Sequence, residues 1–133
     1  MKSDNPNSLS VGIIFGGSEI GTADIYDGTT NTFLIGEKYL MPDNYEGGSL
    51  SDRLPIFTGS FVDSCRNTGG TYYPIQDRNG VGGICYLFGS SHPGSFGMAM
   101  CDGSVQAISY NIDRETNTYL GWRNDGEIAL LSE

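Results

Sequence analysis

Apolar and polar residues alternate most clearly on either side of Asp102-Gly103, where the sequence predicts a β-hairpin. We expect these two residues to form a two-residue type I′ turn, which requires a positive φ at both positions. Such a turn sets Cys101 opposite Ser104. The other face of the hairpin is mixed and carries Gln106 and Ile108. Because side chains alternate across a strand, the face expected to pack on the core carries Phe96, Met98, Met100, Val105 and Ala107.

Two further strands are predicted from the same kind of pattern. Residues 31–40 alternate so that Phe33, Ile35 and Glu37 share one face of the strand. Residues 127–131 are expected to form a closing strand, because they follow a turn-forming Asn-Asp-Gly sequence.

Capping residues predict two short helical segments. Thr22 is a candidate N-cap for a single turn over 23–27, which a glycine is expected to end. Asp113 is a candidate N-cap for a helix over 114–120, which is also followed by a glycine.

The segment 41–82 is rich in Gly, Asn, Asp, Ser and Pro, so we expect it to be long, loop-rich and the least regular part of the domain. Its apolar pairs Ile56-Phe57 and Phe61-Val62 are candidate anchors to the core. The polar N-terminus, 1–10, is expected to be loose. The predicted architecture is one α+β domain over 1–133, with a mostly antiparallel sheet and short helices.

The composition narrows the function classes. The chain has 133 residues, enough for one domain with its own core, and a net charge of −9 with only seven basic residues. Such a surface repels nucleic-acid phosphates and anionic membrane surfaces, so we expect neither as a partner. No apolar run approaches the ~20 residues of a membrane span.

The three cysteines leave two pairing states open. Cys65 and Cys85 are the candidate disulfide, which would close a loop of about 20 residues and contribute roughly 3 kcal/mol to stability in the chain-entropy model. The alternative is three unpaired thiols, with Cys101 as the third.

His92 is the only histidine, so any imidazole chemistry must use it. Ten residues of extended chain at ~3.3 Å each place Asp102 ~30 Å away, at the other end of one strand. We therefore interpret His92 as a structural residue that caps a turn or bonds to a carboxylate or carbonyl. Glu37 is interpreted as a buried acid that holds a loop through backbone amides. We assign no catalytic residue.

Three segments carry a family resemblance. His92 is followed by nine residues and then Asp102-Gly103, residues 23–37 read ADIYDGTTNTFLIGE, and residues 120–128 read LGWRNDGEI. Together they resemble a prepilin-like bacterial family with an H-X9-DG signature, similar to type II secretion pseudopilins, abundant in Planctomycetes and often labelled a domain of unknown function. The matching positions that we single out are His92, Asp102, Gly103, Glu37, Asp27, Gly28 and Asn31.

The resemblance implies a function. It implies a non-enzymatic pilin- or pseudopilin-like head, without cofactor, that serves in a fibre or secretion apparatus or is displayed at the cell surface. It also implies self-assembly and membrane anchoring through an N-terminal helix, and an extracytoplasmic location at the cell surface or in the periplasm. Residues 1–6 are neither a basic leader nor an apolar helix, so the sequence in hand is expected to lack that helix.

Calcium is a further candidate ligand. Asp24, Asp27 and Asn31 cluster around one predicted turn and offer the oxygen ligands that Ca²⁺ prefers. The resemblance to type II secretion pseudopilins also implies calcium, because the major pseudopilins of that system bind it. The spacing is not that of an EF-hand, however, and Asp and Asn are common in turns for local hydrogen-bonding reasons.

Two other functions stay open. An extracellular ligand- or glycan-binding module would use the 41–82 segment and its Tyr72-Tyr73 pair, because aromatic faces stack on sugars. A hydrolase would require His92 and Glu37 to converge in a cleft.

Overall fold

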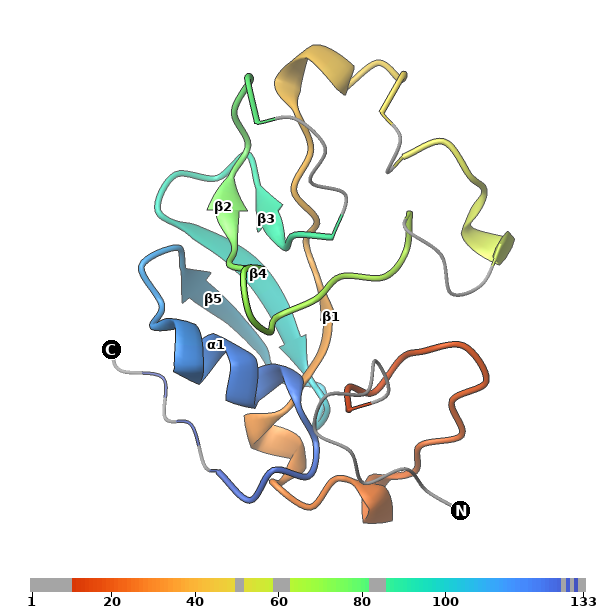
Figure 1. The fold of residues 1–133 in the computed structure, drawn as a ribbon, viewed down its shortest axis with the longest axis vertical. Helices are drawn as coiled ribbons and strands as arrows, with labels where there is room; N and C mark the ends of the chain where they lie inside the picture. Colours follow the sequence, from red (N-terminus) through yellow and green to blue (C-terminus); the bar gives the residue numbers. More distant parts are fainter. Residues whose placement is uncertain are drawn as a thin grey trace.

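The computed structural model describes residues 11–49, 52–58, 63–81, 86–127, 129 and 131 (Figure 1). Its strands are β1 (Phe33–Gly36), β2 (Ile75–Gln76), β3 (Gly89–Ser90), β4 (Ser95–Met100) and β5 (Val105–Ser109). Its helical elements are the 3₁₀ turns η1 (Thr22–Asp24), η2 (Thr29–Asn31), η3 (Pro42–Asn44) and η4 (Ile56–Thr58), and the α-helix α1 (Arg114–Gly121).

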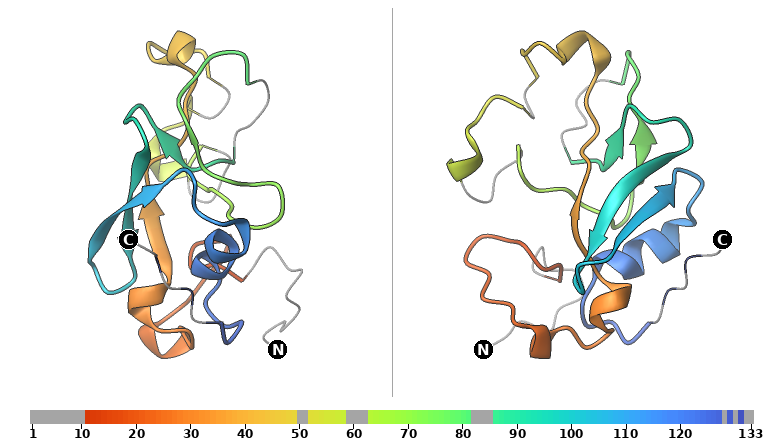
Figure 2. Two further views of the ribbon diagram at one scale, coloured as in Figure 1. Left: turned by 90° about the vertical axis from the view of Figure 1, so that its left-hand side faces the viewer. Right: turned by 180° about the vertical axis from the view of Figure 1, so that it is seen from behind.

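The predicted α+β class is confirmed. β1, β4 and β5 form an antiparallel sheet in the order β1-β4-β5, and α1 lies against one face of it (Figures 1 and 2). A second sheet pairs β2 with β3 in parallel, which the sequence did not predict. The main core lies between the antiparallel sheet and α1 and consists of Phe33, Phe96, Met98, Met100, Ile108, Leu120 and Ala129.

The hairpin exists, but its turn has three residues, so the predicted type I′ turn is wrong. Gly103 has a φ of 88°, while no described residue other than glycine has a positive φ. The amide of Gly103 donates to the carbonyl of Met100, and the amide of Met100 donates to the carbonyl of Ser104. This is a type I turn followed by a left-handed glycine, the arrangement of three-residue hairpins with a bulge.

The longer turn shifts β5 by one residue against β4. Phe96 now faces Ile108, and Ala99 faces Val105. Met98 and Met100 are buried as predicted, but a one-residue shift moves every side chain of β5 to the opposite face. Ile108 is therefore buried in the core, Val105 is 75% exposed and Ala107 is exposed, so the predicted core positions of Val105 and Ala107 are wrong.

β1 contains an irregularity that the predicted alternation missed. The pairing register shifts between Phe33, which faces Met100, and Ile35, which faces Ala99. Phe33 consequently points into the core, whereas Ile35 lies on the outer face and is 61% exposed. The strand is also shorter than predicted, although its line is extended by a single bridge from Lys38 to Phe88. The prediction that Phe33 and Ile35 share a face is wrong because of this bulge.

The helix after the hairpin forms where its cap predicts. The Asp113 carboxylate accepts hydrogen bonds from the amides of Glu115 and Thr116. These bonds hold the pKa of Asp113 below its usual value, that from Thr116 most strongly. The earlier helical turn is only the three-residue η1, and its N-cap is Gly21 rather than Thr22.

The remaining predictions have mixed outcomes. The described residues of the 41–82 segment hold the short elements η3, η4 and β2 and are otherwise loop. Phe57 is 94% exposed and does not anchor the segment, whereas Phe61-Val62 lie outside the described residues, as do residues 1–10. The closing strand is wrong at the described positions, 127, 129 and 131, which have no strand conformation.

Within the described part of the chain, no helix has both the length and the apolar character needed to cross a membrane.

Candidate functional site

The hairpin turn rests on the segment that precedes β1. The amide of Asp102 donates to the carbonyl of Thr29 at 3.0 Å, and the amide of Cys101 donates to the carbonyl of Thr32 at 2.9 Å. Two of the segments that carry the family resemblance, 23–37 and 92–103, are thus joined through their main chains.

The side chain of Asp102 is used within its own turn. Its Oδ1 accepts hydrogen bonds from the amide of Ser104 at 2.8 Å and from the hydroxyl of Ser104 at 2.7 Å. The hydroxyl bond, followed by the amide bond, holds the pKa of Asp102 below its usual value. Asp102 and His92 lie beyond opposite ends of β4, as the strand arithmetic predicts.

Asp27 joins the same region to the third resemblance segment. It is buried, and its two carboxylate oxygens accept hydrogen bonds from the amides of Asp125 and Gly126 at 3.0 and 2.9 Å. The amides of Tyr26 and Asp27 donate in turn to the carbonyl of Arg123. One buried carboxylate therefore fixes the turn that follows α1.

The Asp125 carboxyl is held close to Asp27 by this arrangement. Burial raises the pKa of Asp125 above its usual value, and the nearby charges of Asp27 and Glu127 raise it further. Its Oδ1 accepts from the amide of Glu127, whereas its buried Oδ2 has no hydrogen-bond partner among the described residues. Two poorly solvated acids, Asp27 and Asp125, thus lie side by side in this turn.

Glu37 and His92 meet on the outer side of the sheet. Glu37 Oε2 accepts a hydrogen bond from the amide of Gly97 at 2.6 Å, and Glu37 Oε1 lies 3.6 Å from His92 Nε2. The two side chains are 42% and 66% exposed, so Glu37 holds a backbone amide as predicted but is not buried. His92 lies beside a carboxylate, one of the contacts expected for a structural role.

The side chains of Tyr110 and Ser90 form hydrogen bonds with the backbone of His92. The Tyr110 hydroxyl lies within hydrogen-bond distance of the carbonyls of Ser90 and His92, at 3.1 and 3.2 Å. The amide of His92 donates to the Ser90 hydroxyl at 3.2 Å. Sequence reasoning missed this contribution. The only available signal was the position of Tyr110 directly after β5. There the pairing of β5 with β4 continues, because the amide of Tyr110 donates to the carbonyl of Gly94.

The three candidate calcium ligands already have intramolecular partners. Asp24 Oδ2 accepts from the amide of Gly21, both oxygens of Asp27 accept from the closing turn, and the Asn31 amide group donates to the Asp27 carbonyl. Among the described residues, no three or more His, Cys, Asp or Glu side chains form a group suited to a metal ion. Calcium binding stays a prediction that these contacts do not favour.

The structure describes Cys65 and Cys101 but not Cys85, so it tests the cysteine predictions only in part. Cys101 has its Sγ 3.7 Å from the carbonyl of Phe33, and burial, followed by the charge of Asp102, raises the pKa of its thiol to about 11. Cys85 lies outside the described residues, so the pairing of Cys65 with Cys85 stays a prediction.

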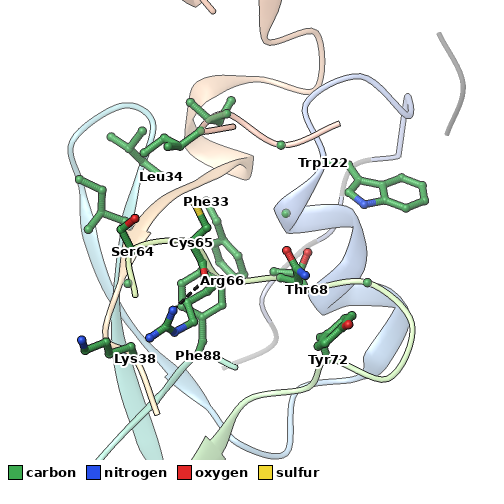
Figure 3. A pocket seen from close by; sticks show the side chains of 18 of the residues that line it. Phe33, Leu34, Lys38, Ser64, Cys65, Arg66, Thr68, Tyr72, Phe88 and Trp122 are labelled. Carbon is green, nitrogen blue, oxygen red and sulfur yellow. Dashed lines mark hydrogen bonds between the residues drawn. The ribbon is translucent and has the colours of Figure 1, made fainter. Parts of the chain in front are cut away.

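A pocket of about 360 Å³ lies on another side of the molecule, beside β1 (Figure 3). Its walls come from 11–14, β1, 63–69, Phe88 and the end of α1. Lys38 and Arg66 lie towards one side of it, and Tyr72 and Trp122 towards the other (Figure 3). Neither Glu37 nor His92 lines this pocket. Sequence reasoning missed it because its walls come from five separate stretches of the chain.

The predicted tyrosine pair does not form one platform. Tyr72 lines the pocket and packs edge-to-face against Tyr86, with ring centroids 6.0 Å apart. Tyr73 instead lies under the guanidinium of Arg114, which is 4.8 Å from its ring centroid. Only Tyr72 is therefore placed to contact a molecule in the pocket.

Comparison with known proteins yields one match. A family model described as a protein of unknown function (DUF1559) matches residues 2–115. The match covers the resemblance segments 23–37 and 92–103. No curated protein and no solved structure matches the chain.

Proposed function

We propose that this chain, which belongs to the DUF1559 family of proteins of unknown function, is the globular head of a pilin- or pseudopilin-like subunit. In this proposal the head is assembled into, or displayed on, an extracytoplasmic fibre or secretion apparatus, and it has no catalytic role. The family description gives no activity, so the proposal rests on the resemblance segments and on how the structure uses their side chains.

The observation that carries the proposal is that these segments hold one another through polar side chains and main chain. Asp27 holds the amides of Asp125 and Gly126, Glu37 holds the amide of Gly97, and the amide of Asp102 is bound by Thr29. A carboxylate that accepts hydrogen bonds from backbone amides stabilises the fold, because charge-assisted hydrogen bonds are stronger than neutral ones. Such use of shared residues supports a structural subunit over an enzyme.

The position of Glu37 and His92 also supports a non-enzymatic role. The two side chains do converge, as a hydrolase would require, but they do so on an exposed surface. The pocket beside β1 is lined by other residues. A general base needs a substrate held within reach of it, and neither side chain lines that pocket.

A second candidate function, a ligand-binding module, is favoured by the pocket itself. Its volume of about 360 Å³ suits a small molecule, and it combines the aromatic rings of Tyr72, Phe88 and Trp122 with polar groups such as Thr68. A sugar or another small extracellular molecule is the class of ligand that such a mixture of rings and hydroxyls fits.

The subunit proposal is tested on the full-length protein in its source organism. An epitope-tagged copy of the whole open reading frame is expressed, and the cells are fractionated, treated with external protease and sheared. We expect the tagged protein outside the cytoplasmic membrane, partly in the sheared material, with an apolar helix ahead of the domain. Recovery of the protein only from the cytosol would contradict the proposal.

The pocket candidate has its own optical test, because Trp122 is the only tryptophan and lines the pocket. Mono- and disaccharides are titrated into the purified chain while the emission of Trp122 is recorded. Binding in the pocket is expected to shift the emission saturably, and Tyr72→Ala is expected to weaken the response. A flat titration for all sugars removes the glycan candidate and leaves the subunit proposal unaffected.

A further inference from the structure

The strand β5 forms one edge of the antiparallel sheet. β4 is its one neighbour among the described residues, and β1 lies on the far side of β4 (Figure 2, right view). An edge strand presents a row of backbone N–H and C=O groups that another extended chain can bind.

The register identifies which backbone groups point outward. The amide of Met100 bonds to the carbonyl of Ser104, and the amide of Tyr110 bonds to the carbonyl of Gly94. In an antiparallel pair, hydrogen-bonded positions alternate, so Gln106 and Ile108 also direct their backbone groups to β4. Val105, Ala107 and Ser109 therefore direct their N–H and C=O groups away from β4. The Ser109 carbonyl also accepts a hydrogen bond from the amide of Ile112, and its second lone pair can accept from another donor.

The side chains leave this edge accessible. Val105, Ala107 and Ser109 are all exposed, Val105 by 75%. β5 also lacks the features by which proteins usually block an edge, since it contains no lysine, no proline and no bulge.

Charge does not oppose pairing along this edge. The protein carries a net charge of −9, yet residues 103–112 contain no Asp, Glu, Lys, Arg or His. Asp102 and Asp113 lie just beyond the two ends of that run. Two copies that approach along β5 therefore pair over ten residues without placing one carboxylate opposite another.

We propose that β5 is a self-association edge, at which it pairs in antiparallel fashion with β5 of a second copy of this chain. A two-fold axis at Ala107 sets it opposite the partner's Ala107 and sets Val105 opposite the partner's Ser109. In this register all three outward positions lie opposite outward positions, so their N–H and C=O groups bond in pairs on both sides of the axis. The two three-stranded sheets become one sheet of six strands.

The pairing needs only the edge itself, so the inference stands whether or not the domain is the head of a pilin-like subunit. A single pair of strands buries little surface, so we expect a weak dimer that is in equilibrium with monomer.

The test is sedimentation velocity of the purified chain from low concentration up to about 1 mM subunits, the range in which the weakest specific dimers form. Two variants are designed to weaken pairing along β5. Ala107→Pro removes an outward N–H that β4 does not use, and Val105→Lys places a charge beside the pairing strand. Val105→Thr is the matched control for the second variant, because it keeps a β-branched, uncharged side chain.

Ile35→Lys separates edge pairing from stacking of the outer sheet faces. Ile35 is exposed in the same cross-strand row as Ala99 and Val105, but it belongs to the strand at the opposite edge. Circular dichroism and thermal melting verify that each variant is folded before it is sedimented.

We expect a concentration-dependent dimer for the wild type, Val105→Thr and Ile35→Lys, and a dissociation constant raised by about tenfold or more in Ala107→Pro and Val105→Lys. Wild-type protein that stays monomeric up to the highest concentration overturns the proposal. So does a dimer that Ile35→Lys abolishes and the folded Val105→Lys leaves unchanged. If Ala107→Pro fails to fold, Val105→Lys alone decides.

Discussion

Glu37 Oε2 accepts a hydrogen bond from the amide of Gly97 at 2.6 Å, and the main chains of the same two residues are also joined, from the Glu37 amide to the Gly97 carbonyl. A Cβ at position 97 would lie 3.2 Å from Glu37 Oε2, so the glycine leaves room for the carboxylate. Glu37 thereby fastens the continuation of β1 to β4, and His92 approaches from the exposed side.

The first prediction compares the two partners of this contact. Glu37→Ala leaves the Gly97 amide without its charged acceptor and is expected to cost about 2 kcal/mol of unfolding free energy. His92→Ala removes only an exposed, weak ion pair and is expected to cost at most about 1 kcal/mol. Urea denaturation measures both values. Glu37→Gln is the control, since its amide oxygen still accepts from Gly97; a larger loss for His92→Ala than for Glu37→Ala would contradict this account.

The second prediction concerns the two hydrogen bonds that the buried Asp27 carboxylate accepts from the amides of Asp125 and Gly126. Asp27→Asn turns an NH₂ group towards one of two backbone amides that need an acceptor, and we expect a loss of about 2 kcal/mol. Asp24→Asn changes the same functional group only three residues away, where the carboxylate caps an exposed turn, and we expect a smaller loss. Thermal melting of the two variants side by side measures both losses of stability. Equal losses would show that the buried hydrogen bonds of Asp27 stabilise the fold no more than the exposed one of Asp24.

The third prediction tests the hairpin turn. Gly103 has a φ of 88° and open space around its Cα, so a side chain there meets no neighbour and only the backbone conformation is strained. Gly103→Val is expected to cost about 2 kcal/mol, because a β-branched residue resists the left-handed region. Gly103→Asn is the control, since Asn tolerates that region better. A melting temperature for Gly103→Val equal to that of the wild type would refute the turn geometry.

Local signals in the sequence predicted the fold where a single residue decides it. The Asp113 cap gives α1, and the alternation of Phe96, Met98 and Met100 gives the core face of β4. The turn was wrong because Asp102-Gly103 fits both a two-residue and a three-residue loop, with the glycine left-handed in each. The predicted register would bury Val105 and Ala107, and the observed one buries Ile108, so both place apolar side chains in the core and the pattern of β5 alone does not choose between them. Packing of Ile108 in the same core as Leu120 of α1 marks the register that forms.

The candidate site was less accessible to sequence reasoning than the fold. Glu37 and His92 meet because the bridge from Lys38 to Phe88 brings together stretches fifty residues apart in the chain. Asp27 and Gly126 are separated by 99 positions. Such pairings depend on the tertiary arrangement of the strands, and single-sequence patterns carry no record of it. The resemblance singled out these residues but did not reveal which of them touch.

The fourth prediction is a pH dependence at Asp125. The pKa of this carboxyl is raised in the folded protein above the ordinary value of 3.8, by burial first and then by Asp27 and Glu127. A raised pKa means that the folded state binds the proton more tightly. The stability it contributes is therefore fully present below about pH 4 and is lost as the pH rises through the raised pKa.

Asp125→Asn removes that loss, because the amide cannot ionise, and its oxygen still accepts from the Glu127 amide. We expect the variant to gain stability relative to wild type between pH 3 and pH 7, measured by urea denaturation at each pH. Glu46→Gln, at an exposed acid that does not act on Asp125, is the control for a general effect of removing one acid. A stability difference between Asp125→Asn and wild type that does not change with pH would contradict the raised pKa of Asp125.

The central claim is that the residues that carry the resemblance hold together an extracytoplasmic subunit and perform no chemistry. The most direct measurement is the amount of full-length protein in the sheared extracytoplasmic fraction of the source organism for wild type, His92→Ala and Asp27→Asn. We predict wild-type amounts for His92→Ala and a reduced amount for Asp27→Asn that follows its lower melting temperature. Wild-type protein confined to the cytosol, or a His92→Ala protein that melts like wild type yet is missing from the fraction, would contradict the claim.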